Sequence, residues 1–300
     1  MPLNYTNFRK ILNRTFAPII EVQKLFRKYY TNLEFQAERD YIDFNEILQL
    51  ASEKYKLRHQ GLKVLDIGCG QRYPQALLMA DENDVIAIDI STILTNWSPL
   101  LIGRILLNEG IKRTVKTIVR KALFDKRYYR KLAKLNGRGF RRKPTILRMN
   151  AENLQFPDNT FDFAFSVGVF EHLGNVDKCV ANMNRVLKPG GIFAIIITNY
   201  TGLTGGHNLY GEDETTTKVP PWDHLRKNIF PSDVYLNGLR IADYKRIFNK
   251  YFDDFKFYEE EANQYAKYLS DEIRKELSAY SEHELLTLGI SIIGRKNPDK

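Results

Sequence analysis

The chain has 300 residues, 43% of them hydrophobic, which is enough to bury the core of one large domain and excludes a globally disordered chain. Its two cysteines, Cys69 and Cys179, are too few for a disulfide framework or a cysteine-rich zinc site, so we expect free thiols in a reducing compartment. Neither a secretory signal nor an uncharged apolar run of about 18 residues is present, which predicts a soluble, cytoplasmic protein.

The formal net charge of +9 is concentrated in one segment. Residues 93–145 contain 15 Lys and Arg residues against two acidic residues, Glu109 and Asp125. The rest of the chain is therefore acidic on balance. Any inference from the high isoelectric point concerns this basic insert and not the whole protein.

The first 60 residues are predicted to form a helical extension or cap. Within them, residues 31–55 place apolar side chains at helical spacing, and Gly61 is expected to end that run. Further along, seven short apolar runs are predicted to be buried strands. These runs are 62–67, 85–90, 146–149, 161–167, 192–198, 255–260 and 286–295.

Helices are predicted between most of these strands, at 74–80, 176–187, 241–252 and 263–278. Lys188-Pro189-Gly190-Gly191 is expected to end the second of them sharply. The insert 93–145 is predicted to be helical, and residues 200–235, rich in Gly, Pro and Thr, to form a long loop. The alternation of strands and helices predicts an α/β fold in which residues 61–300 form one doubly wound, mostly parallel sheet. Ligands of such sheets bind beyond the carboxyl ends of the strands.

Asp66 lies at the end of the first predicted strand, and Gly68 and Gly70 follow it, where glycines allow a ligand to approach the backbone closely. A dinucleotide fingerprint would need a small residue where Tyr73 stands, and Asp66 would repel a pyrophosphate. Both features argue against a nicotinamide-dependent oxidoreductase. A ligand with an ammonium group and no phosphate suits Asp66 better, and S-adenosylmethionine is such a ligand.

Polar residues also end the next two strands. Asp89 is placed to accept hydrogen bonds from ribose hydroxyls, with a surface acid in a turn as the alternative. Asn150 and the Ala151 backbone are candidates for contacts with adenine. The alternative for Asn150 is a cap of the following segment.

Five ordered motifs resemble those of class I S-adenosylmethionine-dependent methyltransferases of the type 11 group. They begin with Val-Leu-Asp-Ile-Gly-Cys-Gly at 64–70 and continue at 87–91, 150–162, 166–173 and 184–191. The resemblance implies a Rossmann-like sheet of seven strands with an antiparallel last strand, and S-adenosylmethionine as the cofactor. The expected cofactor-binding residues are Asp66, Gly68, Cys69, Gly70, Tyr73, Asp89, Ile90, Asn150, Ala151, Glu152, Ser166 and Val167.

Two departures from the family pattern concern the same pocket. Asn150 stands where the family more often has Asp. The segment Gln71-Arg72-Tyr73-Pro74 is bulkier than the small residues that commonly follow the second glycine. We therefore expect the methionyl end of the cofactor to be gripped differently here.

Three histidines, His172, His207 and His224, are candidate catalytic bases, since they follow the fourth and fifth strands, where acceptors usually enter this fold. The alternative for each is packing, capping or ordering of the chain. Their spacing fits no common metal site, and no metal is expected.

The long loop also contains candidate substrate contacts, Tyr210, Trp222 and Asp223. Trp222 is suited to stacking on a sugar or an aromatic ring. The segment 220–225 loosely resembles methyltransferases of bacterial surface-polysaccharide synthesis. The alternative is that these residues only order the loop.

The basic insert has three interpretations. Its apolar residues recur at helical spacing among cations, as in helices that lie on anionic membranes. The same cations could hold nucleic acid or a phosphorylated acceptor, or the insert could be a lid whose cations are solvated. Aromatic residues are sparse beside the cations, which disfavours binding of single-stranded nucleic acid.

The sequence thus predicts a methyltransferase acting on an oxygen or nitrogen of a small molecule or glycan. A surface-polysaccharide precursor and a phosphorylated or lipid-linked acceptor are the candidates. An RNA methyltransferase that uses the insert, and a non-catalytic family member that binds the cofactor, are the alternatives. The oligomeric state is not predicted.

Overall fold

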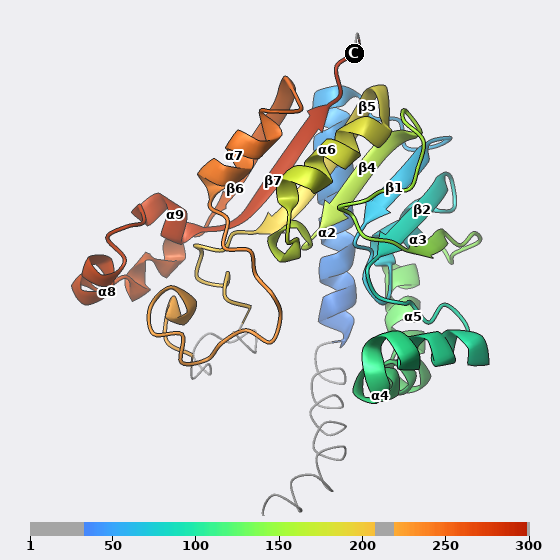
Figure 1. Ribbon diagram of the computed structural model, residues 1–300, viewed down its shortest axis with the longest axis horizontal. Coiled ribbons are helices and arrows are strands. Elements are labelled where there is room, and N and C mark those ends of the chain that lie inside the picture. The colour runs from blue at the N-terminus through green and yellow to red at the C-terminus, as the bar shows by residue number, and fades with distance from the viewer. Residues whose placement is uncertain (1–32, 208–218, 299–300) are drawn as a thin grey trace, which may run out of the picture.

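The computed structural model describes residues 33–207 and 219–298. Its centre is a seven-stranded sheet in the order β3-β2-β1-β4-β5-β7-β6 (Figure 1). Strands β1 to β5 pair in parallel, and β7 runs antiparallel to both of its neighbours. The predicted Rossmann-like fold with an antiparallel last strand is confirmed. The strands are β1 (Lys63–Ile67), β2 (Asp84–Asp89), β3 (Thr145–Arg148), β4 (Phe161–Val167), β5 (Leu187–Thr198), β6 (Asp254–Glu261) and β7 (Thr287–Arg295).

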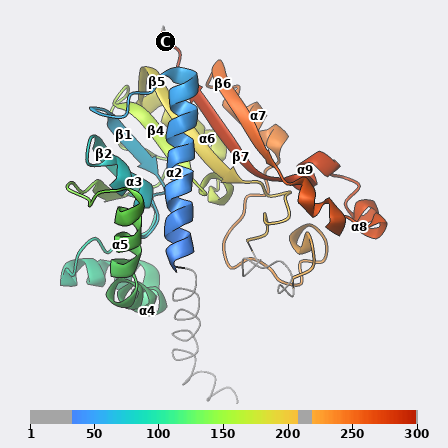
Figure 2. The same cartoon turned by 180° about the vertical axis from the view of Figure 1, so that it is seen from behind.

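The central strands are buried on both faces, as expected for a parallel sheet covered by helices on each side. Helices α2 (Leu33–Tyr55), α3 (Pro74–Met79) and α5 (Asp125–Leu135) cover one face, and α6 (Val176–Val186) and α7 (Ile241–Phe248) cover the other (Figures 1 and 2). Because α2 contributes to this layer, the described part of the N-terminal segment belongs to the core of the domain.

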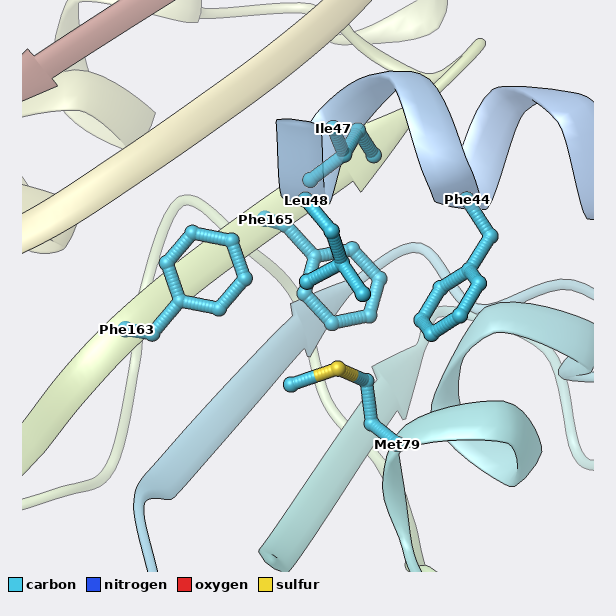
Figure 3. Close-up of a pocket in the computed structure, with 6 residues that line it drawn as sticks. All are labelled: Phe44, Ile47, Leu48, Met79, Phe163 and Phe165. Carbon is cyan, nitrogen blue, oxygen red and sulfur yellow. The ribbon is translucent and has the colours of Figure 1, made fainter. Parts of the chain in front are cut away.

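Helix α2 packs through a stripe of apolar side chains at helical spacing, including Phe44 and Ile47. Figure 3 shows these two side chains meeting Met79 of α3 and two phenylalanines of β4, Phe163 and Phe165. The space between them is apolar and leaves no room for a water molecule. It is therefore a packing contact and not a ligand site.

Several predicted element boundaries differ from the structure. Helix α2 ends at Tyr55, before Lys56 with a φ of 56°, and not at Gly61. Residues 188–191 lie inside β5, which begins at Leu187 directly after α6. The predicted helix 263–278 is divided into η3 (Asn263–Tyr268) and α8 (Asp271–Glu276), because the Ser270 side chain accepts a hydrogen bond from the Ile273 N–H and starts a new helix. Helix α9 (Glu282–Leu286) follows.

The basic insert forms α4 (Pro99–Leu123), kinked at Gly110 with a φ of 80°, and α5. Helix α5 packs against α2, where the Tyr128 hydroxyl donates a hydrogen bond to Asp40. Both cysteines are buried and free. Among the residues described, no helix combines the length and the apolar character that crossing a bilayer requires.

Candidate functional site

The candidate site lies where the parallel strands end. Figure 1 shows that the carboxyl ends of β1, β2, β4 and β5 point toward the end of the molecule that holds α4 and the loop after β5. The 3-10 helix η1 (Phe170–His172) follows β4 at this edge, and a second one, η2 (Asp223–Leu225), lies in the long loop. The topology therefore brings the predicted cofactor and acceptor residues to one edge of the sheet.

The glycine loop after β1 is held by backbone hydrogen bonds to β2. The N–H groups of Gly68 and Cys69 donate to the Ile88 carbonyl at 2.8 and 2.9 Å. Gly68 has a φ of 80°, and a Cβ atom there would lie 2.5 Å from the Val169 side chain. Gly70 has a φ of 65° with open space where its Cβ would be. One glycine is thus required by packing, and the other leaves room for a ligand.

Two carboxylates flank this loop. Asp66 is 3% exposed, and its Oδ2 atom is buried without a hydrogen-bond partner. Burial raises the pKa of Asp66 well above its usual value, and the charge of Asp89 adds to this effect. Asp89 accepts hydrogen bonds from the N–H groups of Gly70 at 3.0 Å and Ser91 at 2.8 Å. A buried carboxylate with an unused acceptor fits a cationic donor such as the ammonium group of S-adenosylmethionine.

The residues after β3 form a tight turn. The Asn150 side-chain oxygen accepts a hydrogen bond from the Glu152 N–H at 2.9 Å, and Glu152 accepts one from the Asn175 N–H at 2.9 Å. Asn150 is exposed and Ala151 is nearly buried. Asn150 therefore caps the following turn, as the alternative interpretation of the sequence predicted. A contact between Asn150 and adenine stays a prediction.

The other predicted cofactor residues differ in accessibility. Ile90 is 66% exposed, whereas Ser166 is fully buried and donates a hydrogen bond from its hydroxyl to the Ile67 carbonyl at 2.7 Å. Val167 is partly buried. Cys69 is buried, and this burial raises the pKa of its thiol. Ser166 thus ties the end of β4 to the end of β1.

The basic insert holds the bulky segment after Gly70. Asp125, at the start of α5, lies 3.0 Å from Arg72 Nε and 3.3 Å from Arg120 Nε; Asp125 and Arg120 are buried, and Arg72 is largely buried. Tyr129 donates a hydrogen bond to the Arg72 carbonyl at 3.1 Å, and its ring packs 6.3 Å from that of Tyr73. Tyr73 is therefore mainly a contact between the loop and the insert.

Neither acidic residue of the insert was predicted to belong to the site. Glu109 accepts a hydrogen bond from the Thr92 N–H at 2.6 Å, just after β2, while Asp125 holds the loop after β1. A signal was present in the sequence: these are the two acids among 15 cations. Both connect the insert to the cofactor end of the sheet.

On the acceptor side the structure brings Glu171, His172 and His207 together. His207 Nε2 lies 3.9 Å from Glu171 Oε1, and the rings of the two histidines are 4.9 Å apart. Burial, with the nearby charges of His172 and His224, lowers the pKa of His207 to about 4, so this imidazole is neutral at pH 7. Burial raises the pKa of Glu171. Glu171 was not among the predicted site residues, since a Glu after a strand gives no signal of burial.

The remaining loop residues are occupied within the fold. Trp222 is 1% exposed, packs with Leu203 and Leu285, and donates its indole N–H to the Leu285 carbonyl at 3.2 Å. This burial excludes the expected stacking on a sugar or aromatic substrate in this conformation, because both ring faces are covered. Asp223 is buried and accepts a hydrogen bond from the Phe230 N–H at 2.8 Å.

His224 is also held by the loop, with Nε2 2.7 Å from the Tyr200 carbonyl. This contact favours the alternative in which His224 orders the chain. Tyr210 lies outside the described residues. Of the predicted acceptor-side residues, His172 and His207 are thus the ones that meet at the edge of the sheet.

A family model described as a methyltransferase domain matches residues 123–195. Among curated proteins, the ubiquinone/menaquinone biosynthesis C-methyltransferase UbiE of Shewanella sp. (strain W3-18-1) is 26% identical over 163 residues, 51% of this chain and 52% of that protein. UbiE of Shewanella oneidensis is 30% identical over 139 residues, 45% of this chain and 42% of that protein. The chain thus spans about half the length of the curated relatives it matches.

Solved structures with a similar arrangement include an S-adenosylmethionine-dependent methyltransferase from Mesorhizobium loti. It is 15% identical, with a TM-score of 0.46 and coverage of 84% of this chain and 99% of that one. The family model, together with the ordered motifs, confirms the predicted resemblance to S-adenosylmethionine-dependent methyltransferases of the type 11 group.

Proposed function

We propose that this chain transfers a methyl group from S-adenosylmethionine to an oxygen or nitrogen atom of a small molecule or glycan. The observation that carries the proposal is the buried, unpartnered Oδ2 atom of Asp66 beside the open space at Gly70. A carboxylate in this state gains most from a ligand that brings a positive charge. A pyrophosphate-bearing cofactor would be repelled at the same place.

The proposed cofactor contacts follow the strand ends. Asp66 receives the ammonium group, and Asp89 accepts hydrogen bonds from the ribose hydroxyls. Asp89 also fixes the loop through the Gly70 N–H. In this proposal Ile90, which is exposed, and the turn at Asn150 border the adenine ring.

The proposed acceptor position is the end of β4 and β5, at Glu171, His172 and His207. S-adenosylmethionine supplies, when bound, a methyl group on a sulfonium that an aligned nucleophile can displace. The side chains around the acceptor mainly have to align it, since alignment alone can lower such a barrier by several kcal/mol, roughly 7 or more in the best cases. Neutral His207, with its unpartnered Nε2, is suited to accept a hydrogen bond or a proton from the acceptor.

The test combines binding and transfer. Calorimetry with S-adenosylmethionine should give an affinity that Asp89→Ala weakens about 100-fold, since hydrogen bonds to a charged group contribute roughly 1.5–3 kcal/mol each. Asp84→Ala, an exposed acid at the start of the same strand, is the matched control and should bind like the wild type. Equal affinities of the two variants would contradict the ribose assignment.

Transfer is measured with labelled S-adenosylmethionine and a panel of acceptors that includes sugars, amines and quinones. Quinones belong in the panel because the named relatives are C-methyltransferases of quinone biosynthesis. Label on an oxygen or nitrogen supports the proposal, and label on a quinone carbon would overturn the choice of acceptor atom. Cofactor binding without any transfer in a lysate would favour the non-catalytic alternative.

We also propose that α4 contacts an anionic membrane surface, which would suit a lipid-linked acceptor. Its apolar residues are unusually open to solvent, with Leu107 87% and Ile111 73% exposed. Exposed cations, Arg104 and Arg113 among them, lie on the same helix. Leucine and isoleucine side chains gain by entering a bilayer interface and gain nothing from a phosphate backbone, so lipid is favoured over RNA.

Vesicle sedimentation tests this contact. Vesicles rich in phosphatidylglycerol should retain the protein better than phosphatidylcholine vesicles, and Leu107→Ser should reduce retention several-fold. Ile42→Ser, which changes a similarly exposed residue on α2, is the control. Equal retention by both vesicle types would contradict the proposal. Steeply salt-dependent binding to RNA without retention by vesicles would also contradict it.

A further inference from the structure

Glu171, His172 and His207, which border the proposed acceptor position, also form a cluster of possible metal ligands. One ligand atom from each side chain lies within 4.8 Å of the others. Two of the residues belong to η1, and the third comes from the loop after β5. The fold, and not a local sequence repeat, thus brings two imidazoles and one carboxylate together.

The carboxylate of Glu171 is the most unusual member. The residue is 1% exposed. Its Oε1 atom accepts the Thr198 N–H at 3.2 Å, whereas Oε2 is buried without a hydrogen-bond partner. Within the described residues, its ion-pair contact is with an imidazole at 3.9 Å. A buried carboxylate that lacks a strong cationic partner is costly, and a bound cation removes that cost.

The two imidazoles are oriented as ligands. His172 Nδ1 lies 2.8 Å from the Tyr235 carbonyl oxygen. An imidazole that donates its Nδ1–H to a carbonyl keeps a lone pair on Nε2, which is how metal-bound histidines are commonly held. The Nε2 atom of His207 is buried without a hydrogen-bond partner, so it also has an unused lone pair or proton.

We propose that Glu171, His172 and His207 bind a divalent transition-metal ion. Two imidazoles and one carboxylate are the protein ligands of several zinc and non-haem iron sites that keep a position open for substrate. Metal–ligand bonds of about 2.1 Å require ligand atoms within about 4 Å of each other. Side-chain movements of about 1 Å would therefore bring the three ligand atoms to bonding distance of one ion.

The three ligand residues lie at the proposed acceptor position. Metal binding itself does not depend on the methyltransferase proposal. The use of the ion does rest on that proposal: as a Lewis acid, it would orient an acceptor oxygen and favour loss of its proton. In that case the ion, and not a free imidazole, activates the acceptor.

The experiment titrates chelator-treated full-length protein with Zn²⁺ in a calorimeter. The wild type should bind one equivalent, and His207→Ala and Glu171→Gln should each weaken binding at least tenfold. His283→Ala is the matched control, because His283 is an exposed imidazole 3.2 Å from Glu259 and 3.4 Å from Glu261. The His283→Ala variant should still bind one equivalent of Zn²⁺ with the affinity of the wild type.

Two further measurements keep the result interpretable. Circular dichroism melting checks folding, and His172→Ala replaces any variant that fails to fold. S-adenosylmethionine binding is measured on the same samples, so that loss of the metal with intact cofactor binding is separated from failure of the proposed function. The proposal is overturned if the wild type does not bind Zn²⁺, or if the His207, His172 and Glu171 variants bind Zn²⁺ with the same affinity as the wild type.

Discussion

The cofactor end and the acceptor end of the same sheet edge are assembled from different kinds of sequence. At the cofactor end, Asp66 is the penultimate residue of β1, Gly70 follows that strand, and Asp89 is the last residue of β2, so each residue is at or within a few positions of a strand end. At the acceptor end, His172 meets His207 and the Tyr235 carbonyl, which belong to a long loop. The first arrangement is encoded locally, and the second needs the tertiary fold.

The two ends also differ in how their loops are held. The cofactor loop, residues 68–73 after β1, is fixed at its second half by the basic insert, through the ion pairs of Asp125 with Arg72 and Arg120. The acceptor loop is fixed by Trp222, which packs in a small core with residues of α8 and α9, and by His224, whose Nε2 atom lies next to the Tyr200 carbonyl. A change in the insert should therefore affect the cofactor end and leave the acceptor end in place.

Among the variants considered, Asp125→Ala should cause the largest change, because it should lower both the stability of the protein and its affinity for the cofactor. It leaves the largely buried guanidinium groups of Arg72 and Arg120 without their shared carboxylate, which costs about 3 kcal/mol of the free energy of unfolding. Affinity for S-adenosylmethionine should fall as well, since Arg72 lies in the cofactor loop. Chemical denaturation and calorimetry measure the two effects.

The control for that change is Asp158→Ala, which breaks an exposed pair with Arg185 at 2.8 Å. An exposed pair contributes at most about 1 kcal/mol, so this variant should behave nearly like the wild type. If Asp125→Ala destabilises the protein no more than this control does, the insert does not hold the loop.

The local encoding explains what the sequence predicted well. Strand positions and the loop at Gly68 and Gly70 were found because buried parallel strands are continuous apolar runs closed by glycine. Trp222 was assigned to the substrate because a tryptophan in a polar loop looks available. Its burial depends on Leu285 from α9, a helix far along the chain, and no local pattern reports that contact.

Asp125 and Glu171 were missed for a related reason. A single carboxylate gives no sign in the sequence of the partners it will meet, and Asp125 stood out only against the surrounding cations. Contacts between distant segments, here α5 with the cofactor loop, decide which acids are buried.

Substitutions at the two glycines should separate packing from ligand access. In Gly68→Ala the new methyl group would meet the Val169 side chain at 2.5 Å, so about 2–3 kcal/mol of stability should be lost. In Gly70→Ala the methyl group would enter open space, so about 1 kcal/mol of backbone strain is expected. Cofactor affinity should nevertheless fall in the second variant, because the open space is where the ligand approaches.

Thermal melting measures the stability of the two variants, and calorimetry measures their affinity for S-adenosylmethionine. We expect the larger loss of stability in one variant and the larger loss of affinity in the other. Gly68→Ala should be the less stable protein, and Gly70→Ala should lose more affinity than its stability change explains. Wild-type affinity in Gly70→Ala would show that the cofactor does not approach this residue.

The smallest expected effect is a pH dependence confined to the cofactor end. Burial raises the pKa of both Asp66 and Asp89 in the free protein. A bound ammonium group favours the ionised carboxylate, so the pKa of Asp66 should be lower in the complex. Affinity should then be highest at pH values above the raised pKa and fall as pH is lowered through it, by at most about tenfold per pH unit for each proton.

Calorimetry from about pH 8 to about pH 5, in two buffers of different ionisation enthalpy, measures both the affinity and the protons released on binding. Asp66→Asn removes the group that titrates, so its affinity should be weaker and less dependent on pH. Because Asp89 lies beside Asp66, some dependence should remain in that variant and disappear in Asp66→Asn with Asp89→Asn. An affinity of the wild-type protein that does not fall with pH would mean that the unpartnered carboxylate of Asp66 does not meet the charge of the ligand.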